Sequence, residues 1–389
     1  MHEQWIKSNV LRGKGALNFS LTKQHEAVRE AARILTEEVI LPGVAHLDRV
    51  FPEILKTLAK QRMMGMTAPR EYGGGGMDEV GHVLTLMELS RGSASVAAFL
   101  AWNNGLYCFS LLEYGTEGQK RAYLPPCAGG EKTGSFALIE SPLSGMDRLT
   151  VVAAGEEGFV SGRGVFLPRG VSCGIVPALF HETGERVFLL VDQERAEGLR
   201  REERLAGGGI FFFGLEEAIF DNGRIGADCL LGRGDGENDR LQRVLQEAWT
   251  CVGALAVGIG AGALKEAVDF AGTQRGRGAL SQCMEWKLAD MAVDVEAARL
   301  LVLKAAWLKD RGKSYEREAA GAKVFSAASA VRASCESLAI LGGRNPGARP
   351  LLERRVRDAE MCRDYYGTIE EAGFCVADHV LGRARMTIF

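Results

Sequence analysis

Cysteines, histidines and glycine-rich segments are the residues of this chain whose types could hold a metal, form disulfides or bind a phosphate. The nine cysteines are scattered, with no Cys-x-x-Cys pair and no paired Cys/His spacing. This pattern predicts neither a zinc site nor a disulfide framework, and we expect the cysteines to be reduced core residues. The loop Gly73–Gly76 is not followed by a Walker-type lysine. It is therefore not a phosphate cradle by itself.

Charge and hydropathy argue against two further classes of partner. The 389 residues carry a formal net charge of -3 at pH 7, and basic and acidic residues are interspersed. Nucleic acid is therefore not expected as a partner. No segment offers about 18 uninterrupted apolar residues, and the N-terminal stretch has no apolar run long enough for a signal peptide. We expect a soluble, cytoplasmic protein with no membrane span.

The first elements that must position any site are helical. Apolar residues recur at helical spacing from Leu21 to Ile40, and Pro42 is expected to close that helix. Thr116 and Gln119 form a Thr-x-x-Gln capping box ahead of another short helix. The sequence thus predicts an N-terminal α-helical domain over residues 1–134.

Composition changes twice along the rest of the chain. Residues 135–234 combine frequent glycines with short apolar stretches bounded by turn residues, a pattern typical of a small β domain. Helical periodicity then returns in long segments, notably Glu285–Lys309, so residues 235–389 are predicted to form a helical bundle. The expected fold is mainly α with a small β domain, in the unusual order helices, β domain, bundle.

Four strings stand in this order along the chain: PREYGGGGMDEV (Pro69–Val80), YGTEGQ (Tyr114–Gln119), KLADMAVDVEAARLL (Lys287–Leu301) and RRVRDAE (Arg354–Glu360). Together they resemble the acyl-CoA dehydrogenase family, and the resemblance covers nearly the whole chain, Leu21–Leu381. It implies a middle β-barrel domain, a C-terminal four-helix bundle and a homo- or hetero-tetramer.

At one residue the sequence departs from what the family's chemistry requires. By resemblance, a glutamate removes the α-proton of an acyl-CoA thioester while the β-hydride passes to FAD, and that base must be ionised at neutral pH. The usual Tyr-Glu-Gly-Thr aligns with Tyr365–Thr368, so Tyr366 stands where the glutamate is expected. A phenol, with a reference pKa near ~10, is a poor base at pH 7.

A second position for the base occurs in some relatives, on the first long helix of the bundle. The equivalent residue here is Ala248, followed by Trp249 where an arginine is common. Glu247 is adjacent, but one residue is about 100° around a helix. We favour a solvated surface glutamate for Glu247 and keep a substitute base as the alternative.

The expected flavin site departs from the family pattern as well. The segment that the family offers to flavin and substrate corresponds to Ile139–Asp147, where Ile139 and Met146 replace hydroxyl residues. The family's Trp-Ile-Thr-Asn, which packs on the flavin ring, corresponds to Phe166–Arg169. Pro168 takes the place of its threonine and has neither a hydroxyl nor an N–H.

Other cofactor positions keep some of their chemistry. Arg275 or Arg277, in a shortened Gln274–Ala279 loop, can pair with a pyrophosphate, and Gly342 and Gly343 permit close backbone approach. An ordinary charged turn and a helix stop are the alternatives for these two segments. Thr368 matches the family residue.

Three functions follow from the resemblance. The first is a working flavoprotein that binds FAD and an acyl-CoA substrate and passes electrons to electron-transfer flavoprotein. The second is a catalytically silent subunit of a hetero-oligomeric acyl-CoA dehydrogenase complex. The third is a biosynthetic relative that uses the fold for different chemistry.

Overall fold

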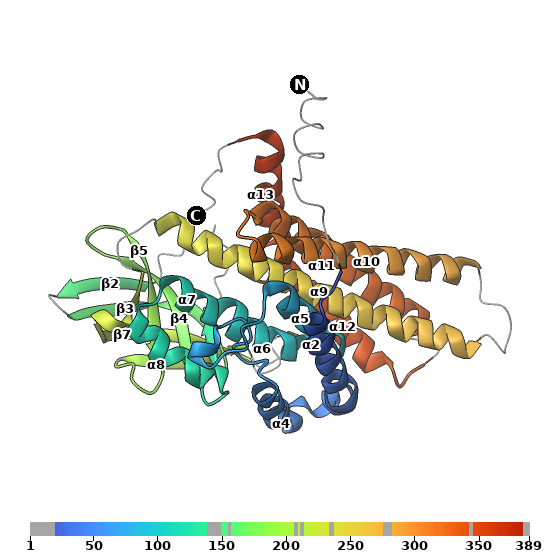
Figure 1. Cartoon of the computed structure of the whole chain (residues 1–389), viewed down its shortest axis with the longest axis horizontal. Helices are drawn as coiled ribbons and strands as arrows, with labels where there is room; N and C mark the ends of the chain where they lie inside the picture. The colour runs from blue at the N-terminus through green and yellow to red at the C-terminus, as the bar shows by residue number, and fades with distance from the viewer. Residues whose placement is uncertain are drawn as a thin grey trace.

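The molecule is elongated, with a sheet at one end, long helices at the other and the N-terminal helices packed against their junction (Figure 1). The prediction of a mainly α fold with a small β domain between two helical regions is confirmed. This computed structural model describes residues 20–137, 149–154, 157–205, 209–210, 214–232, 237–274, 282–341 and 345–383.

The N-terminal region is helical, as expected, but its first helix does not end at Pro42. The path continues through a π-helical turn, Thr36–Ile40, into a short helix that holds Pro42 near its start. A missing N–H is tolerated there because the first turn leaves its N–H groups unbonded. The predicted capping box of Thr116 and Gln119 is present. The helices are α2 (Lys23–Leu35), α3 (Leu41–Gly43), α4 (Leu47–Lys60), α5 (Glu79–Gly92), α6 (Ala94–Ala101), α7 (Phe109–Tyr114) and α8 (Glu117–Ala128).

The described strands form one mixed, eight-stranded sheet in the order β6-β7-β3-β2-β4-β5-β8, with β1 paired to β4. β1 runs parallel to β4, with Phe136 opposite Ile175. The strands are β1 (Gly134–Phe136), β2 (Leu149–Ala154), β3 (Glu157–Pro168), β4 (Cys173–Phe180), β5 (Arg186–Asp192), β6 (Leu199–Leu205), β7 (Leu215–Gly226) and β8 (Leu230–Leu231).

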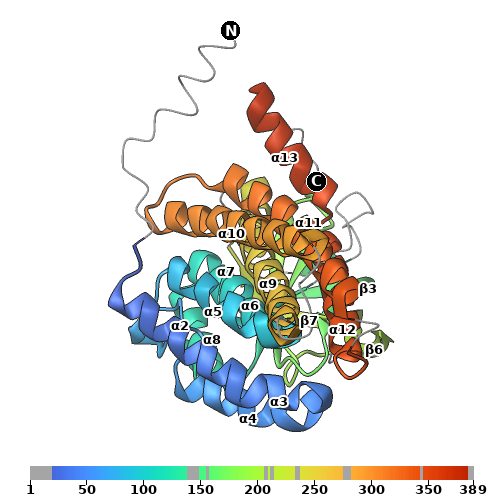
Figure 2. The ribbon, with the colours of Figure 1, turned by 90° about the vertical axis from the view of Figure 1, so that its right-hand side faces the viewer.

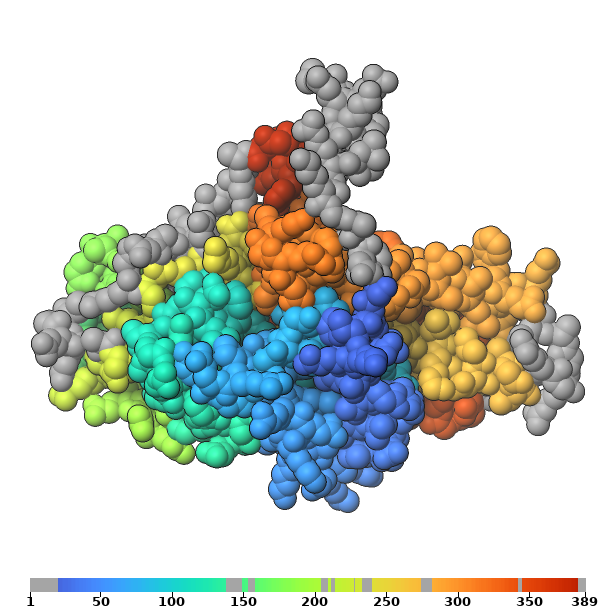
Figure 3. Space-filling model, in the orientation of Figure 1, coloured from blue at the N-terminus to red at the C-terminus, as the bar shows by residue number. Residues whose placement is uncertain are grey.

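Within residues 237–274, 282–341 and 345–383, the bundle is built on three long helices and two shorter ones. α9 lies at its centre, with α10, α11 and α12 around it and α5 on its other side (Figure 2). α13 stands out from the body of the molecule (Figure 3). The helices are α9 (Glu237–Gln274), α10 (Gln282–Asp310), α11 (Glu316–Leu341), α12 (Arg349–Asp364) and α13 (Ile369–Leu381).

Among the described residues the helices share one large hydrophobic core and, within the bundle, a smaller cluster that includes Ala263, Met291 and Leu352, while the sheet has its own. The larger core joins the N-terminal helices to the bundle and includes Phe136 from β1. A second cluster of buried side chains belongs to the sheet and includes Val151, Val165 and Val176. β1 therefore belongs to the sheet by its hydrogen bonds and to the helical core by its side chain.

In the described part of the chain, three helical stretches are long and apolar enough to cross a membrane by length and composition alone, although none is an uninterrupted apolar run. They are Ala94–Tyr114, Arg240–Thr273 and Glu316–Leu341, and their most apolar windows are 89%, 72% and 50% buried inside the protein. Packing within the helical core accounts for their composition.

Candidate functional site

The turn between α12 and α13 holds the residue where a base is expected from the resemblance. Tyr366 has φ of +53° and Gly367 has φ of +89°. A left-handed conformation costs a residue with a Cβ roughly 1–2 kcal/mol, so contacts around the turn must maintain it. Glycine is favoured at the next position because a φ of +89° strains any residue with a Cβ, and a Cβ on Gly367 would also lie 2.8 Å from Oε2 of Glu371.

Two side chains hold the backbone carbonyls of this turn. Lys323 of α11 donates from Nζ to the carbonyl of Tyr365 at 2.7 Å, to that of Tyr366 at 3.4 Å and to that of Gly367. Trp249 of α9 donates from Nε1 to the carbonyl of Tyr366 at 3.0 Å. The turn is thus fixed from two helices of the bundle.

The Tyr366 side chain points into the core and is 2% exposed. Its hydroxyl donates to the backbone carbonyl of Phe136 in β1 at 2.9 Å, and its ring lies 4.6 Å from that of Tyr365. Burial raises the pKa of Tyr366 above its ordinary value. The phenol is therefore neutral at pH 7 and cannot accept a proton as a carboxylate would.

Thr368 closes the turn as the N-cap of α13. Its Oγ1 accepts from the N–H of Glu371 at 3.2 Å, and its own N–H donates to Oε2 of Glu371 at 2.8 Å. This is a capping box. The hydroxyl accepts in this pair, which leaves its hydrogen able to donate to another group.

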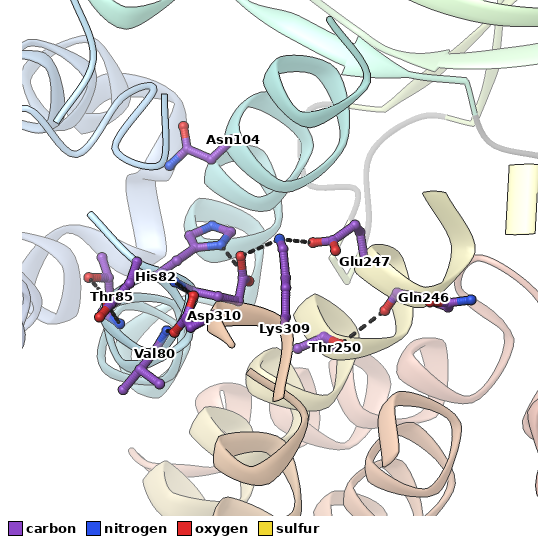
Figure 4. A network of polar contacts seen from close by, with 12 residues as sticks. Val80, His82, Thr85, Asn104, Gln246, Glu247, Thr250, Lys309 and Asp310 are labelled. Carbon is purple, nitrogen blue, oxygen red and sulfur yellow. Dashed lines mark hydrogen bonds and ion pairs between the residues drawn. The ribbon is translucent and has the colours of Figure 1, made fainter. Parts of the chain in front are cut away.

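Glu247 is not the solvated surface glutamate that we expected. It is 0% exposed, and it accepts hydrogen bonds from Nζ of Lys309 and from the hydroxyl of Tyr315. Figure 4 shows the Lys309 ammonium reaching Glu247 on one side and, on the other, the carboxylate beside His82. Sequence reasoning failed here because α10 covers a face of α9 that the local sequence does not mark as buried.

The second carboxylate at Lys309 belongs to Glu79 of α5. Lys309 donates to it at 2.6 Å, and Nδ1 of His82 lies 3.0 Å from its other oxygen. Burial alone would raise the pKa of Glu79, but Lys309 and His82 outweigh it and the pKa falls below its ordinary value. Glu247 shares the same ammonium, and burial raises its pKa to about 7. Glu79, His82, Glu247, Lys309 and Tyr315 are called the buried charge cluster below.

The expected flavin positions are described in part. Phe166 of β3 is half-buried and packs against the same core as Tyr366. Pro168, also in β3, is buried, and its carbonyl lies 3.4 Å from Nη2 of Arg201. The other predicted positions lie outside the described residues: Ile139, Met146, Arg275, Gly342 and Gly343.

Two lysines of these sites were not found from the sequence. Lys323 lies in an Ala-rich stretch of α11, and a lysine among such small residues is a signal that could have been used. Lys309 falls at the end of a predicted helix, where a solvated lysine is ordinary. Its partners come from two other helices.

The architecture consists of an N-terminal helical domain, a central sheet and a helical bundle, and the turn between α12 and α13 is buried where they meet. This arrangement defines a class of protein. Comparison of sequences gives the family. Residues 22–131 match "Acyl-CoA dehydrogenase, N-terminal domain" and residues 237–381 match "Acyl-CoA dehydrogenase, C-terminal domain". The chain belongs to the acyl-CoA dehydrogenase family.

Individual relatives match over nearly their full length. An acyl-CoA dehydrogenase of Bacillus subtilis (strain 168) is 32% identical over 380 residues, which cover 93% of this chain and 99% of that protein. The mitochondrial short-chain specific acyl-CoA dehydrogenase of Bos taurus is 32% identical over 379 residues, or 93% and 91% of the two chains. The structure of butyryl-CoA dehydrogenase from Megasphaera elsdenii superposes with a TM-score of 0.85 at 26% identity, covering 94% of this chain and 100% of that one.

Proposed function

We propose that this chain is an FAD-binding protein that acts on an acyl-CoA thioester, and that residue 366 does not serve as its base. Membership of a family of flavoproteins supports the cofactor and the substrate class. The claim that residue 366 is not the base rests on the Tyr366 phenol, which is buried, neutral and hydrogen-bonded to a backbone carbonyl. When bound, FAD supplies the acceptor for a hydride from the β-carbon.

The described residues fit a flavin in part. The Thr368 hydroxyl has a hydrogen to donate, and the half-buried ring of Phe166 offers an apolar face beside the same core. Pro168 has no hydrogen-bond donor, so at this position β3 cannot donate to the flavin as the family's threonine would. Arg275, Gly342 and Gly343 are proposed to contact the cofactor's phosphates, with Ile139 and Met146 along the segment shared by flavin and substrate.

The visible absorption spectrum of the purified chain tests this proposal. We expect flavin bands, and bleaching by an acyl-CoA that is much faster in the Tyr366→Glu variant than in the wild type, because the variant regains a carboxylate at the turn. Tyr366→Gln is the matched control, since it is equal in size to glutamate but cannot ionise. A protein that stays colourless with added FAD would overturn the proposal.

A second candidate is a silent subunit of a hetero-oligomeric acyl-CoA dehydrogenase. The observation that favours it is that neither candidate base is available: Tyr366 is bonded to Phe136, and Glu247 is bonded to Lys309 and Tyr315. Co-expression with a paralogue that carries an intact Tyr-Glu-Gly-Thr tests it. A stable mixed complex whose activity requires both chains supports this candidate, and independent purification of the two proteins contradicts it.

We further propose a tetramer in the cytoplasm, with electron-transfer flavoprotein as partner of the active form. Large apolar side chains on the bundle support an oligomer, because contiguous exposed apolar surface marks interaction sites. On α10, Trp286 is 70% and Val293 is 68% exposed, and on α13 Phe374 is 58% exposed. Light scattering of wild type and Trp286→Asp tests this, and a wild-type monomer would contradict it.

A further inference from the structure

Lys323 is an unusual residue to find in the middle of a helical bundle. Its side chain is 0% exposed and lies on α11 among small neighbours such as Ala322 and Ser326. Among the ion pairs of the described residues, none involves Lys323. An unpaired buried ammonium is expensive unless dipoles replace the lost water, so its surroundings must supply acceptors.

Those acceptors are three consecutive backbone carbonyls, of Tyr365, Tyr366 and Gly367. They can converge on one nitrogen because Tyr366 and Gly367 are both left-handed, at φ of +53° and +89°. An ammonium has three N–H donors, which equals the number of carbonyls. The turn also follows the C-terminus of α12, where the helix dipole favours a positive charge.

We propose that Lys323 is the positioning residue of the candidate active site: its ammonium gathers the three carbonyls and so sets the direction in which the side chain of residue 366 leaves the turn. The hydrogen bonds described between Lys323 and this turn all go to backbone carbonyls, so they do not depend on which side chain residue 366 carries. The same device would aim a tyrosine or a glutamate toward β1. This inference rests on the proposed function, because it concerns the same site.

The charges around Lys323 come from the two helices that meet at the turn. Burial lowers the pKa of Lys323 to about 7, and it is opposed by the Cys362 thiol and Asp364 on α12 and by Glu370 and Glu371 on α13. The carboxylates oppose the effect of burial on this pKa but do not outweigh it.

Hydrogen–deuterium exchange of the whole chain, prepared without flavin, tests the positioning directly. The peptide to follow spans residues 364–372, in which the amide of Tyr365 donates to the Met361 carbonyl and the amides of Thr368 and Glu371 are bonded in the capping box directly after the turn. In Lys323→Met we expect these amides to exchange about tenfold faster or more, since charge-assisted hydrogen bonds are lost. Lys323→Arg keeps the charge and the donors and should restore most of the protection. Lys265→Met, at an exposed lysine of α9, is the control.

A second readout links the positioning to the site. Lys323→Met in the Tyr366→Glu background should abolish bleaching by acyl-CoA while the flavin bands remain, and Lys323→Arg should recover part of it. Unchanged exchange at residues 364–372 in Lys323→Met would overturn the inference, as would equal loss of protection throughout the chain. Failure to bind FAD would overturn the proposed function and leave the exchange result to stand, because the exchange experiment needs no flavin.

Discussion

Two lysines of the bundle, Lys323 fully buried and Lys309 with a side chain that is 23% exposed, have surroundings that differ in kind. Lys309 lies between the carboxylates of Glu79 and Glu247, which outweigh burial and raise its pKa above the ordinary value. Lys323 faces backbone carbonyls, and burial lowers its pKa. Full negative charges stabilise Lys309, whereas backbone carbonyl dipoles stabilise Lys323. The first arrangement joins three helices, while the second shapes one turn.

The largest expected effect is the loss of Lys309. Lys309→Met would leave Glu79 and Glu247, 3% and 0% exposed, without the ammonium that they share. Removing one partner of a buried ion pair costs about 3–5 kcal/mol of unfolding free energy. We expect the low end of that range, because Glu247, with a pKa of about 7, can take up a proton. Thermal unfolding followed by circular dichroism measures the effect.

The double variant Lys309→Met/Glu247→Gln tests the cause of this loss, because it leaves only the Glu79 carboxylate without the ammonium. It should melt above the single Lys309→Met variant. Lys265→Met, which breaks an exposed pair with Asp269, should leave the melting temperature nearly unchanged. If Lys309→Met melts no lower than Lys265→Met, the buried charge cluster does not contribute to stability as described.

The second prediction is that the two regions respond to pH in opposite directions. Glu247 has a folded pKa of about 7 against an ordinary 4.5, so between those pH values only the folded protein keeps the proton and stability falls as pH rises. Lys323 has a folded pKa of about 7 against 10.5, so between pH 7 and 10.5 only the unfolded protein keeps the proton and stability rises.

Matched variants measure this difference. The stability of wild type relative to Glu247→Gln should decrease from about pH 4.5 to 7, by a few kcal/mol at most. Its stability relative to Lys323→Met should increase from pH 7 toward pH 10. Denaturant titrations at a series of pH values give both curves. Slopes of the same sign would contradict the comparison between the two lysines.

The same contrast explains what the sequence could reveal. Local patterns predicted the order of the three regions and the Thr116 capping box, because capping and helical periodicity depend on residues a few positions apart. The environment of Glu247 was predicted wrongly, and Lys323 was not considered, because each depends on a helix distant in sequence. Tyr366 was singled out only through resemblance to a family. Its bond to Phe136 joins residues that no local pattern relates.

A smaller effect is expected at the Tyr366 hydroxyl. Tyr366→Phe removes the donor to the buried Phe136 carbonyl and keeps the ring, so it should lower the unfolding free energy by about 1–2 kcal/mol. The left-handed turn should persist, because Lys323 and Trp249 hold the backbone. Unchanged hydrogen exchange at residues 364–372 checks this point. Loss of protection there would mean that the side chain of residue 366, rather than Lys323, maintains the turn.

The smallest expected effect separates the cap of α13 from the turn that precedes it. Thr368→Ala removes the hydroxyl that accepts from the N–H of Glu371, and loss of such an N-cap costs about 1 kcal/mol. Exchange should quicken in the first turn of α13, while the Trp249 indole N–H, bonded to the Tyr366 carbonyl, should stay protected in nuclear magnetic resonance spectra. Thr116→Ala, in the equivalent capping box of α8, is the matched control. If Thr368→Ala exposes the indole N–H as fully as Lys323→Met does, the helix cap contributes as much to positioning the turn as the buried lysine.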